Sequence, residues 1–230
     1  MKILIVPDVH GRDFWKEAVK DNSFDKIIFL GDYLDHYRKE STDEHDIETL
    51  KDIIELKKNN PDNIILLIGN HDCPYIWPNE YGRALGDYWC RHDYGNHEYI
   101  NKLFNDNLDL FTLAWECDNE KYGKVLFTHA GVTNIFKKKC GLTAKEINEY
   151  FFNNIPELAR VSYRRGGIDN SGSIVWADVL EHVVSQVPQI FQIFGHTYSR
   201  SEIIYDHFAM LDTGKYCWIL TDKGLEKYEN

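Results

Sequence analysis

The stretch 64–72 constrains the fold more strongly than any other part of the chain. It begins as an apolar run of five residues, of the kind that a buried strand requires, and then breaks at Gly69. Glycine tolerates a sharp turn without a Cβ penalty. An amide, an imidazole and a carboxylate follow in successive positions. We therefore expect these groups at the carboxyl end of a strand, where open α/β sheets bind their ligands.

Strand and helix patterns alternate over the first third of the chain. Short apolar runs at 3–6 and 26–30 read as buried strands, in addition to the one at 64–68. The segments 12–22 and 43–60 between them carry apolar residues at spacings that predict helices. This order is typical of right-handed βαβ units with a largely parallel sheet.

The remaining two thirds contain further strands and helices. Residues 73–122 are rich in Tyr, Trp, Gly, Asn and Pro, which predicts an irregular insert with some helix after Glu98. Strand patterns return at 124–128 and 189–194, and the segment 203–220 reads as an antiparallel meander. Thr143 and Glu146 form the capping-box pattern of a helix over 143–152. With neither repeat nor linker, residues 1–230 are expected to form one domain.

Charge and cysteine usage limit the partners and the compartment. A net charge of −11 opposes the binding of large nucleic acids or anionic membranes, which requires a basic surface. It does not oppose a small phosphorylated substrate, because bound cations can reverse the field locally. The five cysteines are scattered and never spaced Cys-x-x-Cys, and no apolar run approaches membrane-spanning length. We expect a protein of the reducing cytoplasm.

Metal-capable side chains follow five of the apolar runs. Imidazole, carboxylate and amide oxygen together suit divalent transition metals better than they suit a thiolate site. Each pattern alone is a weak signal, because an Asp-x-His pair is more often a turn with a surface histidine. Their joint occurrence after successive strands predicts convergence at one sheet edge. The residues are Asp8 and His10, Asp32 and Asp35, Asn70 and His71, His129, and His196.

These positions fall in five motifs that resemble those of the calcineurin-like metallophosphoesterases. The resemblance covers residues 3 to about 221 and is closest to the branch of Ser/Thr protein phosphatases, bacteriophage phosphatases and symmetrical dinucleoside tetraphosphatases. It implies an α/β (α+β) fold, a four-layer sandwich of two mixed β-sheets flanked by helices, with a dimetal site at strand ends. The motifs are Asp8-x-His10, Gly31-Asp32-x-x-Asp35, Gly69-Asn70-His71-Asp72, Thr128-His129-Ala130-Gly131 and Gly195-His196-Thr197.

The resemblance also implies roles for individual residues. Asp8, His10 and Asp32 would hold a first metal, and Asp32 would bridge to a second one. The second metal would be completed by Asn70, His129 and His196. Mn is the favoured metal, with Fe, Zn, Ni and Co as alternatives. A hydroxide bridging the metals would attack phosphorus, His71 would protonate the leaving oxygen, and Asp35 would orient His71.

The chain departs from this branch at two positions. Its protein phosphatases follow the second Asp with an arginine that grips the substrate phosphate, and here His36 stands instead. Other members end the last motif with a second histidine, where this chain has Tyr198. An arginine from elsewhere would have to bind the phosphate, since guanidinium matches it bidentately. The candidates are Arg91, Arg164 and Arg165.

The sequence thus predicts a metal-dependent phosphoester hydrolase acting on a phosphomonoester. The substrate could be a phosphoprotein, a nucleotide or another small molecule. One alternative is a nucleotide pyrophosphatase or phosphodiesterase acting on dinucleoside polyphosphates or cyclic nucleotides. The other alternative is a catalytically silent scaffold. Retention of His71 and Asp35 argues against the scaffold, because it has no physical need for a proton donor.

Overall fold

The computed structural model describes residues 1–36, 41–81 and 95–229, and strands within these ranges form two mixed β-sheets. The six-stranded sheet has the order β11-β10-β1-β2-β3-β4, and the five-stranded sheet has the order β5-β6-β7-β9-β8. The first comprises β1 (Ile3–Val6), β2 (Lys26–Phe29), β3 (Ile64–Leu67), β4 (Phe111–Thr112), β10 (Trp218–Thr221) and β11 (Gly224–Lys227). The second comprises β5 (Ala114–Asn119), β6 (Gly123–Thr128), β7 (Phe191–Phe194), β8 (Ile203–Tyr205) and β9 (Phe208–Met210).

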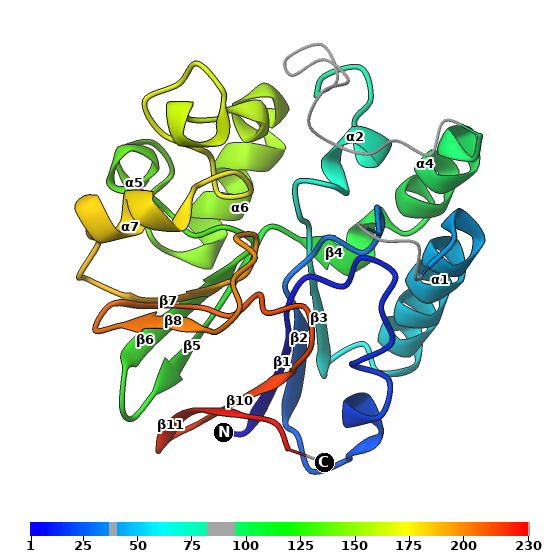
Figure 1. Cartoon of the computed structure of the whole chain (residues 1–230), viewed down its shortest axis with the longest axis horizontal. Coiled ribbons are helices and arrows are strands. Elements are labelled where there is room, and N and C mark those ends of the chain that lie inside the picture. Colours follow the sequence, from blue (N-terminus) through cyan, green and yellow to red (C-terminus); the bar gives the residue numbers. More distant parts are fainter. Residues whose placement is uncertain (37–40, 82–94, 230) are drawn as a thin grey trace.

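Helices flank both sheets, with α1 and α4 beside the first sheet and α5, α6 and α7 beside the second (Figure 1). The α-helices are α1 (Asp43–Asn59), α2 (Cys73–Ile76), α4 (His97–Asn105), α5 (Asn134–Cys140), α6 (Ala144–Phe152) and α7 (Val179–Val184). Short 3-10 helices are η1 (Ala18–Lys20), η2 (Leu108–Leu110), η3 (Ile155–Ala159) and η4 (Tyr163–Arg165). No helix in the described ranges is both long and apolar enough to cross a membrane.

Strands β1 to β4 run parallel to one another, as the alternation of strand and helix predicts. Successive residues of a strand point to opposite faces, so an all-apolar strand is buried on both sides. In β1, Ile3 and Ile5 belong to the cluster between the two sheets, whereas Leu4 and Val6 belong to the cluster under the helices. The first sheet is therefore a central layer.

The core between the sheets completes the layered arrangement. From the first sheet it contains Ile28 and Leu67, and from the second sheet Phe127 and Ile193. The outer clusters pack α1 on the first sheet and α7 on the second. The order is helix, sheet, sheet, helix, which confirms the expected four-layer sandwich.

The predicted helix over 12–22 is wrong. Only the short η1 forms within it, at Ala18–Lys20. The apolar residues Trp15 and Ala18 are buried, and their spacing of three suits a 3-10 turn as well as an α-helix. The preceding loop is held in place by His10, whose backbone nitrogen donates to the Asp32 carbonyl at 2.7 Å.

The predicted antiparallel meander over 203–220 is also wrong. β8 and β9 form an antiparallel hairpin, but β9 pairs in parallel with β7 in the second sheet. β10 crosses to the first sheet, where it lies antiparallel to β1 and β11. Alternating apolar residues predict a strand but say nothing about its partner, which depends on contacts remote in sequence.

Regular elements occupy much of the segment 73–122. It contains α2, α4, η2 and β4, and the second sheet begins within it at β5, which pairs antiparallel with β6. Residues 82–94, with Arg91 among them, lie outside the described residues. The capping box predicted for Thr143 and Glu146 is confirmed at the start of α6.

Candidate metal centre and active site

The loops that follow five strands bring the candidate residues together. These loops come after β1, β2 and β3 of the first sheet and after β6 and β7 of the second. Every candidate side chain on them is buried, with less than a tenth of its surface exposed. The residues are Asp8, His10, Asp32, Asp35, Asn70, His71, His129 and His196.

The backbone of this region is strained at four candidate positions. Among the described residues, the non-glycine residues with positive φ are His10 (45°), Asp32 (54°), Asp35 (64°) and His196 (66°). L-residues rarely adopt this region, which costs them about 1–3 kcal/mol each, and such strain gathers at functional sites. The strained set lies entirely within the residues that the motifs select.

Two glycines allow the loops after β2 and β3 to touch. A Cβ atom placed on Gly31 would lie 2.5 Å from the backbone nitrogen of Gly69. A Cβ atom on Gly69 would lie 2.1 Å from Oδ1 of Asp32. Both distances are far inside van der Waals contact, so neither position accepts a side chain without a backbone shift. The glycines bring Asp32 next to the loop that carries Asn70 and His71.

Asp72, to which the sequence reasoning gave no role, clamps the same two loops. Its Oδ2 accepts hydrogen bonds from the backbone nitrogens of Asp32 (2.9 Å) and Gly69 (2.8 Å). Its Oδ1 accepts from the backbone nitrogen of Tyr33 at 3.0 Å. Burial and the charge of Asp32 raise the pKa of Asp72 to about 7. The signal available in the sequence was its place in the Gly69–Asp72 motif.

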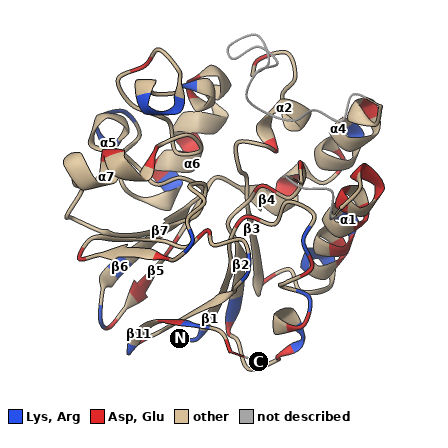
Figure 2. Cartoon of the chain, in the orientation of Figure 1, with Lys and Arg blue, Asp and Glu red and all other residues tan. Residues whose placement is uncertain are grey.

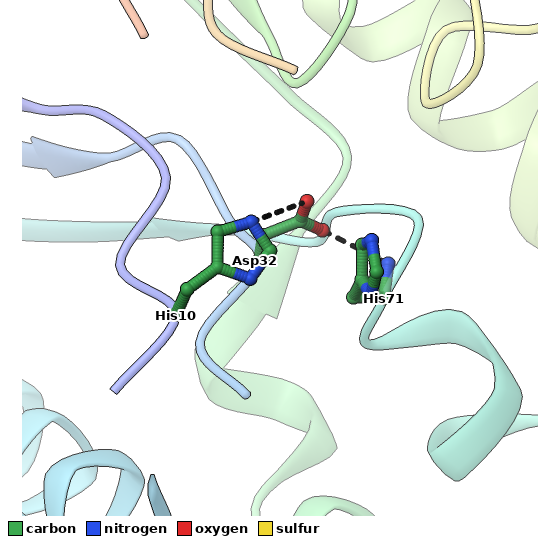
Figure 3. Close-up of side chains that lie close together, drawn as sticks. All are labelled: His10, Asp32 and His71. Atoms are coloured by element: carbon green, nitrogen blue, oxygen red, sulfur yellow. Dashed lines mark hydrogen bonds and ion pairs between the residues drawn. The ribbon is translucent and has the colours of Figure 1, made fainter. Parts of the chain in front are cut away.

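Asp32 lies at the centre of the site. Its Oδ2 is 3.5 Å from Nε2 of His10 and 3.4 Å from Nε2 of His129. Its Oδ1 accepts a hydrogen bond from the backbone nitrogen of His71 at 2.9 Å. Figure 3 shows Asp32 between His10 and His71. Two groups of ligand atoms, each within 4.8 Å, share Asp32: one with His10 and His71, the other with His129 and His196.

The second group converges on the Asn70 side chain. Oδ1 of Asn70 lies 2.9 Å from Nε2 of His129 and 2.8 Å from Nδ1 of His196. Nδ1 of His129 donates to the Leu30 carbonyl at 2.7 Å, which directs Nε2 toward Asn70 and Asp32. Burial lowers the pKa of His129, but Asp32 and Asp8 outweigh it and raise the pKa to about 9.

His10 is oriented in the same way. Its Nδ1 donates to the Leu34 carbonyl at 2.8 Å, so Nε2 faces Asp32. Metal-binding histidines typically use one nitrogen for the ion and the other for such a fixing hydrogen bond. Burial lowers the pKa of His10 to about 3, so its imidazole is neutral, the form that binds metal.

Asp8, in the loop after β1, contacts the loop after β7. Both of its carboxylate oxygens lie 3.0 Å from the backbone nitrogen of His196. A Cβ atom on Gly195 would lie 1.9 Å from Oδ1 of Asp8, so this approach requires glycine. Burial and the charge of Asp32 raise the pKa of Asp8.

The residues present fit divalent metal ions. Asp8 and Asp32 are buried carboxylates close enough to repel each other, a costly arrangement unless cations compensate it. Nε2 of His196 is buried, and no residue in the described ranges offers it a hydrogen bond. The donor set of carboxylate, imidazole and amide oxygens suits divalent transition metals.

His71 lies close to these donors, and its Nδ1 is engaged by a carboxylate. Its Nδ1 lies 2.8 Å from Oδ2 of Asp35, and Oδ1 of Asp35 accepts a hydrogen bond from the Tyr75 hydroxyl at 2.8 Å. Burial lowers the pKa of His71, but Asp32 and Asp35 outweigh it, and the net pKa is raised. Asp35 thus orients the imidazole, and the raised pKa favours its protonated form.

The candidate arginines differ in their surroundings. The Arg165 guanidinium donates to the Thr197 hydroxyl, next to His196, and its Nε lies 3.0 Å from Oδ2 of Asp178. After burial, its charge is the largest cause lowering the pKa of His196. Arg164 is exposed on the same 3-10 helix, η4. Arg91 lies outside the described residues.

Two further residues near the site were not singled out as functional from the sequence. His36, in the position of the expected arginine, is buried with Nδ1 2.9 Å from Oδ2 of Asp46. Arg12 donates to the carbonyls of Val9 (3.0 Å) and Asp8 (2.8 Å), which ties its guanidinium to the backbone of the first motif. Its proximity to the Asp8-x-His10 motif was the one available signal for Arg12.

A family model described as calcineurin-like phosphoesterase matches residues 1–208. A search of curated protein sequences gave no significant match.

Solved structures with a similar fold include a Ser/Thr phosphatase from Saccharomyces cerevisiae with similarity to human phosphatase PP5. It has a TM-score of 0.56 and 14% identity, over 100% of this chain and 80% of that one. The YfcE phosphoesterase of E. coli has a TM-score of 0.43 and 10% identity, over 98% and 91% of the two chains. A metallophosphoesterase from Sphaerobacter thermophilus has a TM-score of 0.43 and 15% identity, over 100% and 89%. At 14% identity, the similarity to the yeast phosphatase shows a shared fold alone.

Proposed function

The chain belongs to the calcineurin-like phosphoesterase family and is a metal-dependent phosphoesterase-type hydrolase, and we propose that its substrates are phosphomonoesters. We propose further that it uses two divalent metal ions that share Asp32. The observation that carries this is the position of Asp32 Oδ2, 3.5 Å from one histidine and 3.4 Å from another in separate ligand groups.

In this proposal the two metal ions have separate sets of ligands except for Asp32, which they share, and His71 is not a ligand. Asp8, His10 and Asp32 hold the first ion, and Asp32, Asn70, His129 and His196 hold the second. Two divalent ions at such a site, Mn being the favoured choice, lower the pKa of a bound water and stabilise negative charge on the phosphoryl oxygens.

His71 serves as the proton donor to the leaving oxygen. The bond from Nδ1 to Asp35 fixes the ring, so the proton for the leaving group comes from Nε2. The raised pKa of His71 favours the protonated form that donates. Asp35 is in turn positioned by the hydroxyl of Tyr75. General acid catalysis of this kind typically contributes about 10²–10⁴-fold to the rate.

Arg165 binds a phosphoryl oxygen of the substrate. Its link to Thr197 and its ion pair with Asp178 hold the guanidinium beside the loop that carries His196. A guanidinium held by two partners loses little entropy when it binds a phosphate. Arg164, exposed on the same short helix, is assigned no role.

A substrate panel tests the proposed function. The purified chain is loaded with Mn²⁺ and assayed with p-nitrophenyl phosphate, bis-p-nitrophenyl phosphate, a dinucleoside tetraphosphate and a phosphopeptide. Two of these compounds are monoesters, p-nitrophenyl phosphate and the phosphopeptide. We expect the highest kcat/KM of the panel for one of these two monoesters. The variant Asp32→Asn, purified in the same way, controls for contaminating phosphatases. Faster turnover of the diester or the dinucleotide would indicate the alternative enzymes, and no turnover at all would indicate a silent scaffold.

A further inference from the structure

A cavity of about 520 Å³ lies beside His10. We refer to it as the His10 cavity. Its walls come from the loop after β1, the residues at the start of α1, and the segment 212–215 that precedes β10. Small-molecule sites typically enclose about 300–1,000 Å³. The His10 cavity is therefore large enough for a nucleotide-sized group next to a candidate metal ligand.

Two cations line the His10 cavity, Arg12 and Lys215. The protein is acidic, with a net charge of −11, and its acidic residues are spread over the chain, including helix α1 (Figure 2). These two cations are therefore of opposite sign to the net charge. Arg12 is fixed by hydrogen bonds to the carbonyls of Asp8 and Val9. Its charge also lowers the pKa of Asp8 and of Asp212 against the effect of burial, so Arg12 lies near two carboxylates. Lys215 is exposed, and among the described residues no ion pair with a carboxylate involves it.

The carboxylates of the His10 cavity have other partners. Asp13 lies 3.0 Å from Nζ of Lys16 and 3.3 Å from Nε2 of His45, which also lines the cavity. Asp212 is buried, and its Oδ1 accepts a hydrogen bond from the backbone nitrogen of Gly214 at 3.0 Å. The lining thus carries two cations, of which Arg12 lies near Asp212 and Lys215 is exposed, while the charge of Asp13 is compensated by Lys16 and His45.

An aromatic ring completes the lining. Tyr198 is 56% exposed and stands where other members of the family are expected to carry a second histidine. An exposed tyrosine at the edge of a site can stack on a nucleobase or another flat group. The lining therefore offers cations for a phosphate and a ring for the group attached to it.

We propose that the His10 cavity binds the leaving group of the substrate and selects small molecules whose leaving group carries a second phosphate. This inference rests on the phosphoryl hydrolysis of the proposed function, because the cavity acquires its meaning from a phosphoryl group bound next to His10. It extends the substrates from phosphomonoesters to phosphoanhydrides such as nucleoside diphosphates. Arg12 and Lys215 bind the second phosphate, and Tyr198 packs against the remainder of the leaving group. A protein phosphoserine offers no second phosphate and is disfavoured.

A nucleoside diphosphate is a suitable probe. In its hydrolysis the oxygen of water forms a bond to the β-phosphorus, and the bond from that phosphorus to the bridging oxygen breaks. The bridging oxygen leaves with the nucleoside monophosphate and takes up a proton, and inorganic phosphate is the other product. For ADP the leaving group is AMP, whose α-phosphate would lie against Arg12 and Lys215.

The test compares ADP with p-nitrophenyl phosphate, which has a single phosphate, in the Mn²⁺-loaded protein. Lys215→Ala should lower kcat/KM for ADP at least tenfold more than it lowers kcat/KM for p-nitrophenyl phosphate. Lys215→Arg retains the charge and should restore most of the ADP activity. Lys223→Ala removes an exposed lysine in the turn between β10 and β11, outside the cavity lining, and serves as the matched control.

A binding measurement keeps this test independent of turnover. Calorimetry with α,β-methylene-ADP, which is not cleaved at the modified bond, should show at least tenfold weaker binding in Lys215→Ala than in wild type. Equal losses on both substrates, or unchanged binding in Lys215→Ala, would overturn the cavity assignment. If wild type hydrolyses neither substrate, the proposed function fails, and the calorimetry alone decides whether the cavity binds a diphosphate.

Discussion

The Nδ1 atom of His71 lies 2.8 Å from Oδ2 of Asp35, and this contact distinguishes His71 from the three histidines proposed as metal ligands. His10 and His129 direct Nδ1 to backbone carbonyls, as metal-binding histidines commonly do. Pairing with a carboxylate instead raises the affinity of an imidazole for a proton. The arrangement suits a proton donor standing beside a metal site.

Removal of His71 should damage chemistry more than metal binding. In His71→Ala we expect kcat to fall by about 10²–10⁴-fold on phenyl phosphate, whose phenol is a poor leaving group. The loss on p-nitrophenyl phosphate should be smaller, because its leaving group needs little protonation. Both rates are to be measured at full Mn²⁺ occupancy, which elemental analysis verifies. Equal losses on the two substrates would exclude the acid role, and a lost metal ion would make His71 a ligand.

Asp35→Asn should change the pH dependence of the same reaction. The Asp35 carboxylate is among the groups that raise the pKa of His71, and the active form of His71 is the protonated one. Activity should therefore decline as pH rises through that pKa, and the decline should begin at lower pH in the variant. The control is Tyr75→Phe, which removes the hydrogen bond to Asp35 but keeps the carboxylate. A falling limb that does not move in kcat against pH would contradict the assignment.

The positions of the candidate residues in the fold could be predicted from the sequence because the signals are local. An apolar strand followed by glycine and polar residues specifies its own end, as at Gly69, and parallel strands place such ends at one edge. The Asp72 clamp connects the loops after β2 and β3 through their backbone nitrogens, which leaves no residue pattern. The pairing of β9 with β7 could not be predicted either, because it is also made by backbone groups remote in sequence.

Gly69→Ala should disrupt the contact between the loops after β2 and β3. The new Cβ would meet Asp32, so we expect a loss of about 1–3 kcal/mol in the free energy of unfolding. Metal affinity should fall as well, because Asp32 must move. Gly123→Ala is the comparison: nothing lies near its Cβ, and its φ of 71° costs about 1–2 kcal/mol of strain. Denaturation and Mn²⁺ titration of both variants check this, and unchanged metal affinity in Gly69→Ala would refute it.

The two neighbouring arginines of η4 form a matched pair for the phosphate-binding role. Arg165→Met should lower kcat/KM. The loss should correspond to about 2–4 kcal/mol of transition-state stabilisation, on the scale of a buried charged partner. Arg164→Met changes the same charge at an exposed position and should alter kcat/KM by less than about twofold. Steady-state kinetics on p-nitrophenyl phosphate decide between them. Equal effects of the two substitutions would mean that Arg165 has no special contact with the substrate.

The number of Mn²⁺ ions bound per chain tests the shared role of Asp32 most directly. It is measured by equilibrium dialysis followed by elemental analysis, with circular dichroism to show that each variant is folded. We predict two ions in wild type and a loss of Mn²⁺ in both Asp32→Ala and Asp32→Asn. Asp43→Ala, which alters a separate group of His36, Asp43 and Asp46, should still bind two. One ion or none in wild type, or two ions retained in Asp32→Ala, would contradict the account.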